Sequence, residues 1–144
     1  MNIRRKARET ALQVLYKMDM ADGGPAEVEA GMEGLAQGTE ARKYCEAIVG
    51  GVTSRRAEVD SVIEEHSENW TMERMAVVDR NILRVAVYEL KYRPDVPYRV
   101  IIDEAVELAK KYGSEESGPF INGIIDRIRK GLRENEPALK INEG

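Results

Sequence analysis

The basic residues near the N-terminus are the side chains of this chain best suited to chemistry, and that chemistry is phosphate binding. Four of them fall within five positions: Arg4, Arg5, Lys6 and Arg8. Residues 21–40, by contrast, contain five acids and no base. A local basic patch of this kind can contact phosphates with an affinity that falls as salt rises. The alternative interpretation is a basic terminus that serves solubility alone.

Two aromatic residues could add base stacking to phosphate contact. Tyr16 lies two helical turns after Arg8, on the same side of the predicted helix. Rings in such positions stack on unpaired bases of single-stranded RNA. Phe120 follows the polar loop 113–119 at the start of a predicted helix, whose amide groups could face an anion. For Phe120 the alternative is core packing through Ile124.

Residues for catalysis or metal binding are scarce. Cys45 and His66 are each the only residue of their type, so neither a disulfide within the chain nor a Cys/His zinc cluster can form. We expect Cys45 to be a small core residue and His66 to lie on the surface. Gly50-Gly51 lacks the lysine-serine pair of a phosphate-binding loop. The sequence therefore predicts a binding protein, with no enzyme activity, no cofactor and no metal.

Length and composition define what must position these residues. The chain has 144 residues, 42% hydrophobic and 33% charged, which is typical of one compact and mostly helical unit. The formal net charge of −4 argues against a protein that coats nucleic acid without specificity, although this argument concerns only the average. No uninterrupted apolar segment follows the basic N-terminus, and we expect a cytoplasmic protein.

Apolar periodicity indicates an all-α helical bundle. The first three helices are expected at 4–18, at 25–35, and from a cap at Thr39 to near His66. The fourth runs from a cap at Thr71 to the prolines at 94 and 97, the fifth follows these prolines and ends at Gly113, and the last runs from Phe120 to Leu132. The helix after Thr71 carries apolar groups around most of its axis and is predicted to be the central, most buried one. Residues 134–144 show no periodicity and are predicted to form a disordered tail.

Four stretches, in this order, resemble the bacterial transcription antitermination factor NusB family. They are RRKARE with ALQVLY at 4–16, VDRNILR with YEL at 78–90, VP with DEAVELAK at 96–110, and FING at 120–123. The resemblance covers about residues 2–132. It implies two small helical subdomains, which we place at 1–68 and 69–133. It also implies binding of the single-stranded boxA RNA of ribosomal RNA operons, together with the small-subunit ribosomal protein NusE, in an RNA polymerase antitermination complex.

The resemblance further implies roles for individual residues. Those assigned to RNA are Arg4, Arg5, Lys6, Arg8, Tyr16, Glu116 and Phe120, and the residue assigned to the NusE side is Asp79. Two positions depart from the family. Asp103 stands where the family usually has Asn, a change that could alter a buried hydrogen bond. Gly118-Pro119 replaces a position that is often basic, so this loop would attract RNA less strongly.

Three alternatives stay open at this point. The chain could be a helical scaffold that binds only protein and whose basic terminus is incidental. It could also be related to the NusB-like domain that precedes the catalytic part of ribosomal RNA cytosine methyltransferases, although it contains no nucleotide-binding strand-loop-helix. Finally, a homodimer could bury the RNA surface.

Overall fold

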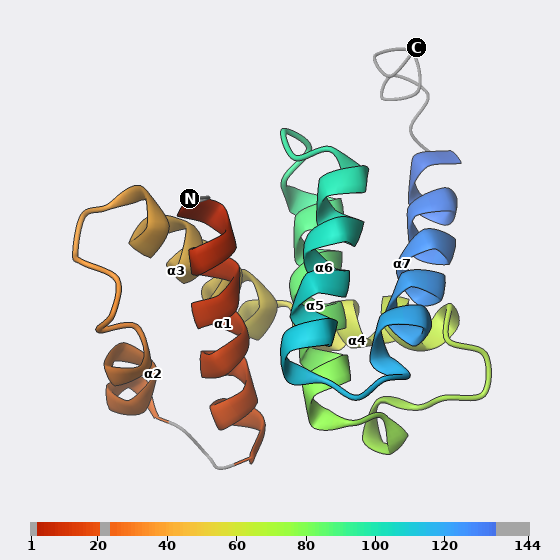
Figure 1. The fold of residues 1–144 in the computed structure, drawn as a ribbon, viewed down its shortest axis with the longest axis horizontal. Helices are drawn as coiled ribbons and strands as arrows, with labels where there is room; N and C mark the ends of the chain where they lie inside the picture. Colours follow the sequence, from red (N-terminus) through yellow and green to blue (C-terminus); the bar gives the residue numbers. More distant parts are fainter. Residues whose placement is uncertain (1–2, 21–23, 135–144) are drawn as a thin grey trace.

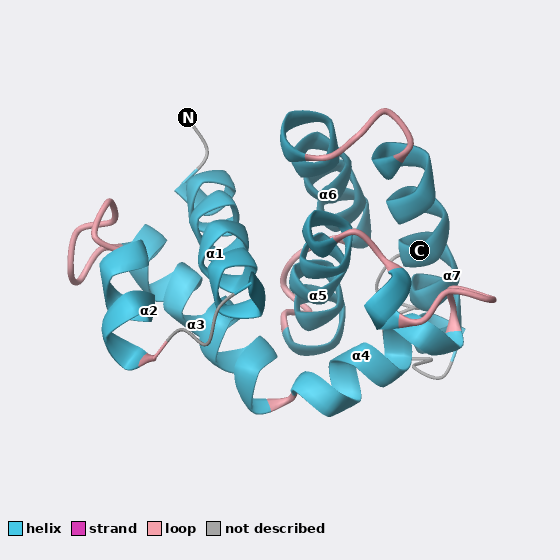
Figure 2. Ribbon diagram, turned by 90° about the horizontal axis from the view of Figure 1, so that it is seen from below, coloured by secondary structure: helices cyan, strands magenta, loops and turns pink. Residues whose placement is uncertain are grey.

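The structure is a computed structural model that describes residues 3–20 and 24–134, and those residues are helical with no strand (Figures 1 and 2). The elements are α1 (Ile3–Met20), α2 (Pro25–Gly31), α3 (Glu40–Ser54), α4 (Arg56–Glu65), the 3-10 helix η1 (Met72–Arg74), α5 (Val77–Tyr92), α6 (Tyr98–Tyr112) and α7 (Ser117–Glu134). The predicted all-α fold is confirmed. Residues 135–144 of the predicted tail lie outside the described residues.

Helix α5 is shared by two apolar cores. The N-terminal core joins α1, α2 and α3 and receives Val85 and Tyr88 from α5. The C-terminal core joins α4, α6 and α7 to the remaining faces of α5. Every residue of α5 from Asn81 to Leu90 is buried, as predicted for the central helix. The molecule is therefore two helical units built on one common helix.

Helix α4 packs with the C-terminal core. It lies within residues 1–68, and its residues Val59 and Ile63 are fully buried in that core. Figure 2 shows α4 leaving the end of α3 and running beneath α5 toward α7. The chain turns at Arg55, where φ is −119°, and not at Gly50-Gly51. Packing thus places the change of unit between α3 and α4.

Two helix starts also differ from expectation. Helix α5 begins at Val77, because residues after Thr71 form the separate turn η1. Helix α7 begins at Ser117, three residues before Phe120. Pro119 then occupies the first turn of α7, where a missing backbone N–H costs nothing. As a result Phe120 lies inside the first turn of α7 and not at the end of a loop.

Cys45 and His66 differ in how they match their predictions. Cys45 is fully buried in the N-terminal core, as expected, and burial raises the pKa of its thiol to about 11. His66 was expected on the surface but is half-buried at the end of α4. Its Nδ1 lies 2.8 Å from the carbonyl oxygen of Val62.

None of the described helices has the length and apolar character that a membrane span requires.

Gly51 allows α3 to approach α5 closely. A Cβ at this position would lie 2.2 Å from Cε1 of the buried Tyr88, so Gly51→Ala must displace a rigid ring. We expect this change to lower the free energy of unfolding by about 1–3 kcal/mol, measured as an unfolding midpoint at a lower urea concentration. Gly50→Ala is the matched control, because a Cβ there meets open space. A Gly51→Ala midpoint equal to that of the control would contradict the close packing.

An ion-pair network around Asp19 ties the end of α1 to α5. The Asp19 carboxylate accepts hydrogen bonds from Arg80 at 2.7 Å, from Asn81 at 3.0 Å and from Arg84 at 2.9 Å. Burial alone would raise the pKa of Asp19, but the hydrogen bonds from Arg80 and Asn81 and the charge of Arg84 outweigh it and lower the pKa to about 2. The Asp19 carboxylate is therefore ionised at neutral pH and can accept all three hydrogen bonds.

This network predicts a loss of stability in acid. Because the folded pKa of Asp19 lies below its unfolded value, its contribution of about 2 kcal/mol is present above pH 5 and is lost as the pH falls toward 2. In Asp19→Asn we expect a lower stability at pH 7 and a flatter decline between pH 5 and 2, measured by urea unfolding at each pH. Asp103→Asn, on the exposed side of α6, is the control and should keep the wild-type pH profile.

Candidate nucleic-acid interface

The first turn of α1 presents the basic segment at one end of the molecule, beside α6 (Figure 1). Arg5 and Lys6 are exposed and Arg4 is half-buried. A guanidinium nitrogen of Arg4 lies 3.2 Å from a carboxylate oxygen of Asp95, and its guanidinium carbon lies 4.7 Å from the centre of the Tyr44 ring. Arg4 is thus oriented by an acid and an aromatic ring while keeping contact with solvent.

Arg5 is held by Glu104 of α6. Its Nε lies 3.0 Å from one carboxylate oxygen and its terminal nitrogen 2.7 Å from the other. The side chain of Glu104 is 9% exposed, whereas that of Arg5 is 53% exposed. Hydrogen bonding and the charge of Glu104 raise the pKa of Arg5, so the guanidinium stays charged. A partner anion can therefore reach an arginine whose position is already fixed.

Arg8 lies inside the protein, which corrects the expectation that it belongs to the RNA surface. It is 2% exposed, and its Nε and terminal nitrogen each lie 2.8 Å from an oxygen of Glu89, which is 1% exposed. Tyr44 donates a further hydrogen bond to the same carboxylate. Position 8 lies three and four residues before the buried Ala11 and Leu12, so it shares the core-facing side of α1. Arg8 anchors α1 to α5.

Helices α1 and α6 run side by side in the same direction. Three contacts follow one another along them: Arg5 with Glu104, Glu9 with Lys111 at 2.7 Å, and Gln13 with Tyr112 at 3.0 Å. A hollow of about 320 Å³ lies along this seam, and its charged lining consists of three bases and three acids: Arg5, Lys110, Lys111, Glu9, Glu104 and Glu107. The seam therefore continues a line of bases from the first turn of α1, each of them in an ion pair with an acid.

Tyr16 lies at that other end and is 37% exposed. It was expected on the same side of the helix as Arg8, but eight residues turn an α-helix about 80° past two full turns. This offset takes Tyr16 out of the core while Arg8 stays within it. The ring borders a hollow of about 280 Å³, which is also lined by Leu12, Gln13, Lys17, Val78 and Tyr112.

Phe120 takes the packing role considered for it in the sequence. It is half-buried and packs against the C-terminal core. Its ring also meets Trp70 edge to face, with ring centres 5.7 Å apart and an angle of 72°. Trp70 is 45% exposed and was not singled out in the sequence. The sequence did offer a signal for Trp70, since it is the only tryptophan and lies between Glu68 and Glu73. A large ring in such a polar loop often marks a binding surface.

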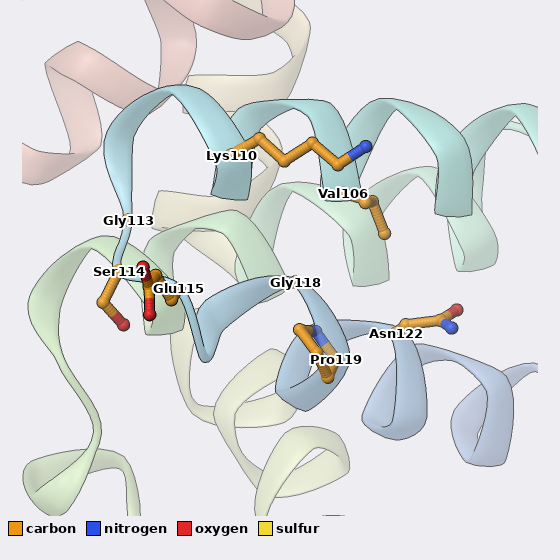
Figure 3. Close-up of a pocket in the computed structure, with 8 residues that line it drawn as sticks. All are labelled: Val106, Lys110, Gly113, Ser114, Glu115, Gly118, Pro119 and Asn122. Carbon is orange, nitrogen blue, oxygen red and sulfur yellow. The ribbon is translucent and has the colours of Figure 1, made fainter.

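The loop between α6 and α7 carries Glu116 in an exposed position. Figure 3 shows the hollow next to it, with Lys110 and Val106 on α6 facing Pro119 and Asn122 on α7. The hollow has a volume of about 630 Å³. Lys110 stands across from Gly118-Pro119, so a basic side chain borders this loop even though the family's basic position is missing.

Asp79 and Asp103 complete the placement of the sequence-based assignments. Asp79 lies in the first turn of α5 and is 9% exposed. Among the described residues its Oδ1 has no hydrogen-bond donor. Asp103 is exposed on α6, so the departure at this position does not alter a buried hydrogen bond. The candidate interface thus has Arg4, Arg5 and Lys6 in the first turn of α1 and Tyr16 near the end of that helix, with Glu116 and Phe120 at the start of α7.

Known proteins resemble this chain in sequence and in structure over most of its length. A sequence model described as the NusB family matches residues 5–130. The transcription antitermination protein NusB of Myxococcus xanthus (strain DK1622) is 46% identical over 139 residues, which cover 93% of this chain and 99% of the relative. NusB of T. maritima has a TM-score of 0.82 and 37% identity, over 88% of this chain and 90% of that one. A crystal structure of antitermination factors NusB and NusE in complex with dsRNA contains a chain with a TM-score of 0.81 and 33% identity, over 91% of this chain and 98% of that one.

Proposed function

The chain belongs to the NusB family, and from this premise we propose that it is a transcription antitermination factor that binds boxA RNA of ribosomal RNA operons. The proteins named NusB are antitermination factors and not enzymes. The RNA is bound as a single strand, because the surface offers separate aromatic rings that unpaired bases can stack on. The proposed RNA residues are Arg4, Arg5, Lys6, Tyr16, Glu116 and Phe120.

The single observation that carries this proposal is the arrangement along α1. Arg5 and Lys6 are exposed at its first turn and Tyr16 is exposed near its last. Acids on neighbouring elements hold Arg4 and Arg5 in place. The Arg4–Asp95 pair is exposed on both sides, and such pairs contribute about 0–1 kcal/mol, so a phosphate can replace Asp95 at small cost. Glu104 is nearly buried and holds Arg5 in place, while about half of the Arg5 side chain stays open to a phosphate.

We propose the small-subunit ribosomal protein NusE as the protein partner, within an RNA polymerase antitermination complex. Asp79 supports a docking position at the start of α5, because it lies in the first turn of that helix and keeps 9% of its surface exposed. A donor from a partner can bind the exposed edge of this carboxylate, and such charge-assisted bonds are strong. RNA and NusE each add contacts to the same complex, so each is expected to strengthen binding of the other.

Sizing of the protein alone, with NusE, and with NusE and single-stranded boxA RNA tests this function. We expect a pair with NusE that becomes more stable when RNA is added, and a shift in the titration midpoint measures the coupling. A pair whose affinity does not respond to RNA would instead support the protein-binding scaffold. A homodimer that disappears when RNA is added would indicate that the free protein buries its RNA surface.

Trp70 provides an intrinsic reporter for the Phe120 end of the interface. It is the only tryptophan of the chain, and its ring centre lies 5.7 Å from that of Phe120. If RNA stacks at Phe120, the tryptophan emission should change on titration with boxA RNA, because its exposed ring changes environment. Phe120→Leu should reduce that response. An emission spectrum unaffected by saturating RNA would remove Phe120 from the proposed interface.

A methyltransferase-related role makes a different prediction. It requires binding of a methyl-donor cofactor or methyl transfer by the chain, and calorimetry with the cofactor would detect the first. We expect no heat of binding, because the family match covers residues 5–130 and its named members are antitermination proteins.

A further inference from the structure

We propose that the hollow beside Tyr16 holds one nucleobase of the bound RNA, with Tyr112 as a second aromatic wall and Gln13 as the residue that contacts the base edge. This inference rests on the proposed function, since it describes how the same surface holds single-stranded RNA. Neither Tyr112 nor Gln13 was singled out in the sequence, because each is contributed by a different helix and only packing brings them together.

The shape and lining of the hollow suit a single planar ring. Its volume is about 280 Å³, slightly below the range of about 300–1,000 Å³ found for pockets that take drug-sized molecules. Two tyrosine rings and two aliphatic side chains form most of the lining, with one amide and one amine beside them: Tyr16, Tyr112, Leu12, Val78, Gln13 and Lys17. Leu12 is 2% exposed, so the floor of the hollow is apolar.

A hydrogen bond fixes two of these side chains against each other. Nε2 of Gln13 donates to the hydroxyl of Tyr112 at 3.0 Å. A glutamine amide has a second N–H and a carbonyl oxygen, which together match the paired donor and acceptor groups on the edge of a base. The bond to Tyr112 therefore orients an amide that can discriminate between bases, while the rings supply stacking that every base accepts.

Cations border the hollow along the route that a phosphate backbone would follow. Lys17 belongs to its lining, and Nζ of Lys111 lies 5.5 Å from the centre of the Tyr112 ring. The second hollow of the α1–α6 seam is lined by Lys111 and Arg5 together with their partners Glu9 and Glu104. From Arg5 to Tyr16, α1 rises about 16 Å. The hollow thus continues the proposed phosphate-binding surface and is not an isolated apolar patch.

This basic border favours RNA over a protein side chain as the occupant. An apolar anchor from a protein would gain from the two rings but would bring no charge for Lys17, which lines the hollow. Lys111 beside it is already paired with Glu9 at 2.7 Å. A base attached to a phosphodiester backbone satisfies both features at once, since its ring is apolar on its faces and its backbone carries negative charge.

Substitution of Tyr112 tests the aromatic wall. We expect Tyr112→Leu to raise the Kd for a fluorescein-labelled single-stranded boxA RNA about ten-fold, with the slope of log Kd against log salt unchanged, because stacking releases no counterions. Tyr112→Phe keeps the ring and should stay within about two-fold of wild type. Circular dichroism of both variants verifies folding, since Tyr112 also packs against the C-terminal core.

Gln13→Ala tests the base contact at an exposed position that folding does not depend on. We expect it to reduce the difference in Kd between the boxA RNA and RNAs with single base changes, at one position of the RNA only. Gln37→Ala is the matched control, because Gln37 is also exposed and donates to a single side chain, Glu29, at 3.1 Å. The control should keep the full discrimination of the wild type.

The outcomes separate this inference from the function on which it rests. The nucleobase site is overturned if Tyr112→Leu and Gln13→Ala both keep the wild-type RNA affinity and discrimination while the loss of Arg5 and Lys6 weakens binding. The RNA function would then still stand. Absence of RNA binding by the wild type would overturn the function itself. Weaker binding of NusE with unchanged RNA affinity in Tyr112→Leu would assign the hollow to protein and also overturn the nucleobase site.

Discussion

Arg8→Ala is expected to lower the free energy of unfolding by about 3–5 kcal/mol, because it leaves the carboxylate of Glu89 buried without its counter-charge. Both residues are at most 2% exposed and their side chains share two hydrogen bonds of 2.8 Å. The measurement is urea unfolding at pH 7. Lys6→Ala is the control, since Lys6 is exposed, and it should change the free energy of unfolding by no more than about 0.5 kcal/mol.

A double-mutant cycle sharpens this test. In the matching single variants, Arg8→Met leaves Glu89 without its arginine, and Glu89→Leu leaves the buried Arg8 guanidinium with only Glu104, 3.6 Å from one of its nitrogens. Both single variants should be strongly destabilising. The double variant Arg8→Met/Glu89→Leu removes both charges, so its loss should be smaller than the sum of the single losses. Additive losses would show that the pair does not act as a unit. A stability of Arg8→Ala equal to that of Lys6→Ala would contradict the burial of the Arg8–Glu89 pair.

Arg4→Ala, Arg5→Ala and Lys6→Ala combined should weaken binding of single-stranded boxA RNA about 50-fold at 0.15 M salt. Each phosphate contact to a single strand contributes about −0.7 to the slope of log K against log salt, so three contacts account for about 2 units of slope. The counterion contribution to binding vanishes at about 1 M salt. A slope difference of about 2 between that concentration and 0.15 M corresponds to the 50-fold change in affinity. Fluorescence anisotropy between 0.05 and about 0.3 M salt measures both quantities.

A charge-matched control separates local contact from net charge. Lys43→Ala, Arg55→Ala and Lys130→Ala combined removes three exposed bases from α3, from the turn before α4 and from α7. Both triple variants lower the net charge by three, but only the first one alters the α1–α6 seam. We expect the control to keep the wild-type slope. Equal losses in the two variants would mean that RNA responds only to the total charge.

The sequence predicted the fold well where one helix face dominates. The apolar pattern from Asn81 to Leu90 predicted a buried central helix, and that helix is buried along its whole middle. Boundaries that depend on neighbouring elements were less accurate. Helix α4 joins the C-terminal core through Val59 and Ile63, which no local pattern reveals, and Pro119 belongs to the first turn of α7 and not to the loop before it.

The candidate site shows the same division between local and tertiary information. A run of basic residues is visible in the sequence, but the acid that each one meets lies far along the chain. Glu89 lies 81 positions after Arg8 and buries it, whereas Glu104 lies 99 positions after Arg5 and leaves it exposed. The pairing of Gln13 with Tyr112 is equally distant. Residue type therefore predicted the chemistry, and only packing decides which arginine can perform it.

The most direct test of the central claim is the affinity of the wild-type protein for three labelled RNAs at 0.15 M salt, each with and without NusE. The RNAs are a single strand that carries boxA, a single strand with the same bases in shuffled order, and the boxA strand in a duplex. We expect the single-stranded boxA RNA to bind most tightly and NusE to increase that preference. Equal affinity for all three RNAs, unchanged by NusE, would contradict the proposed function.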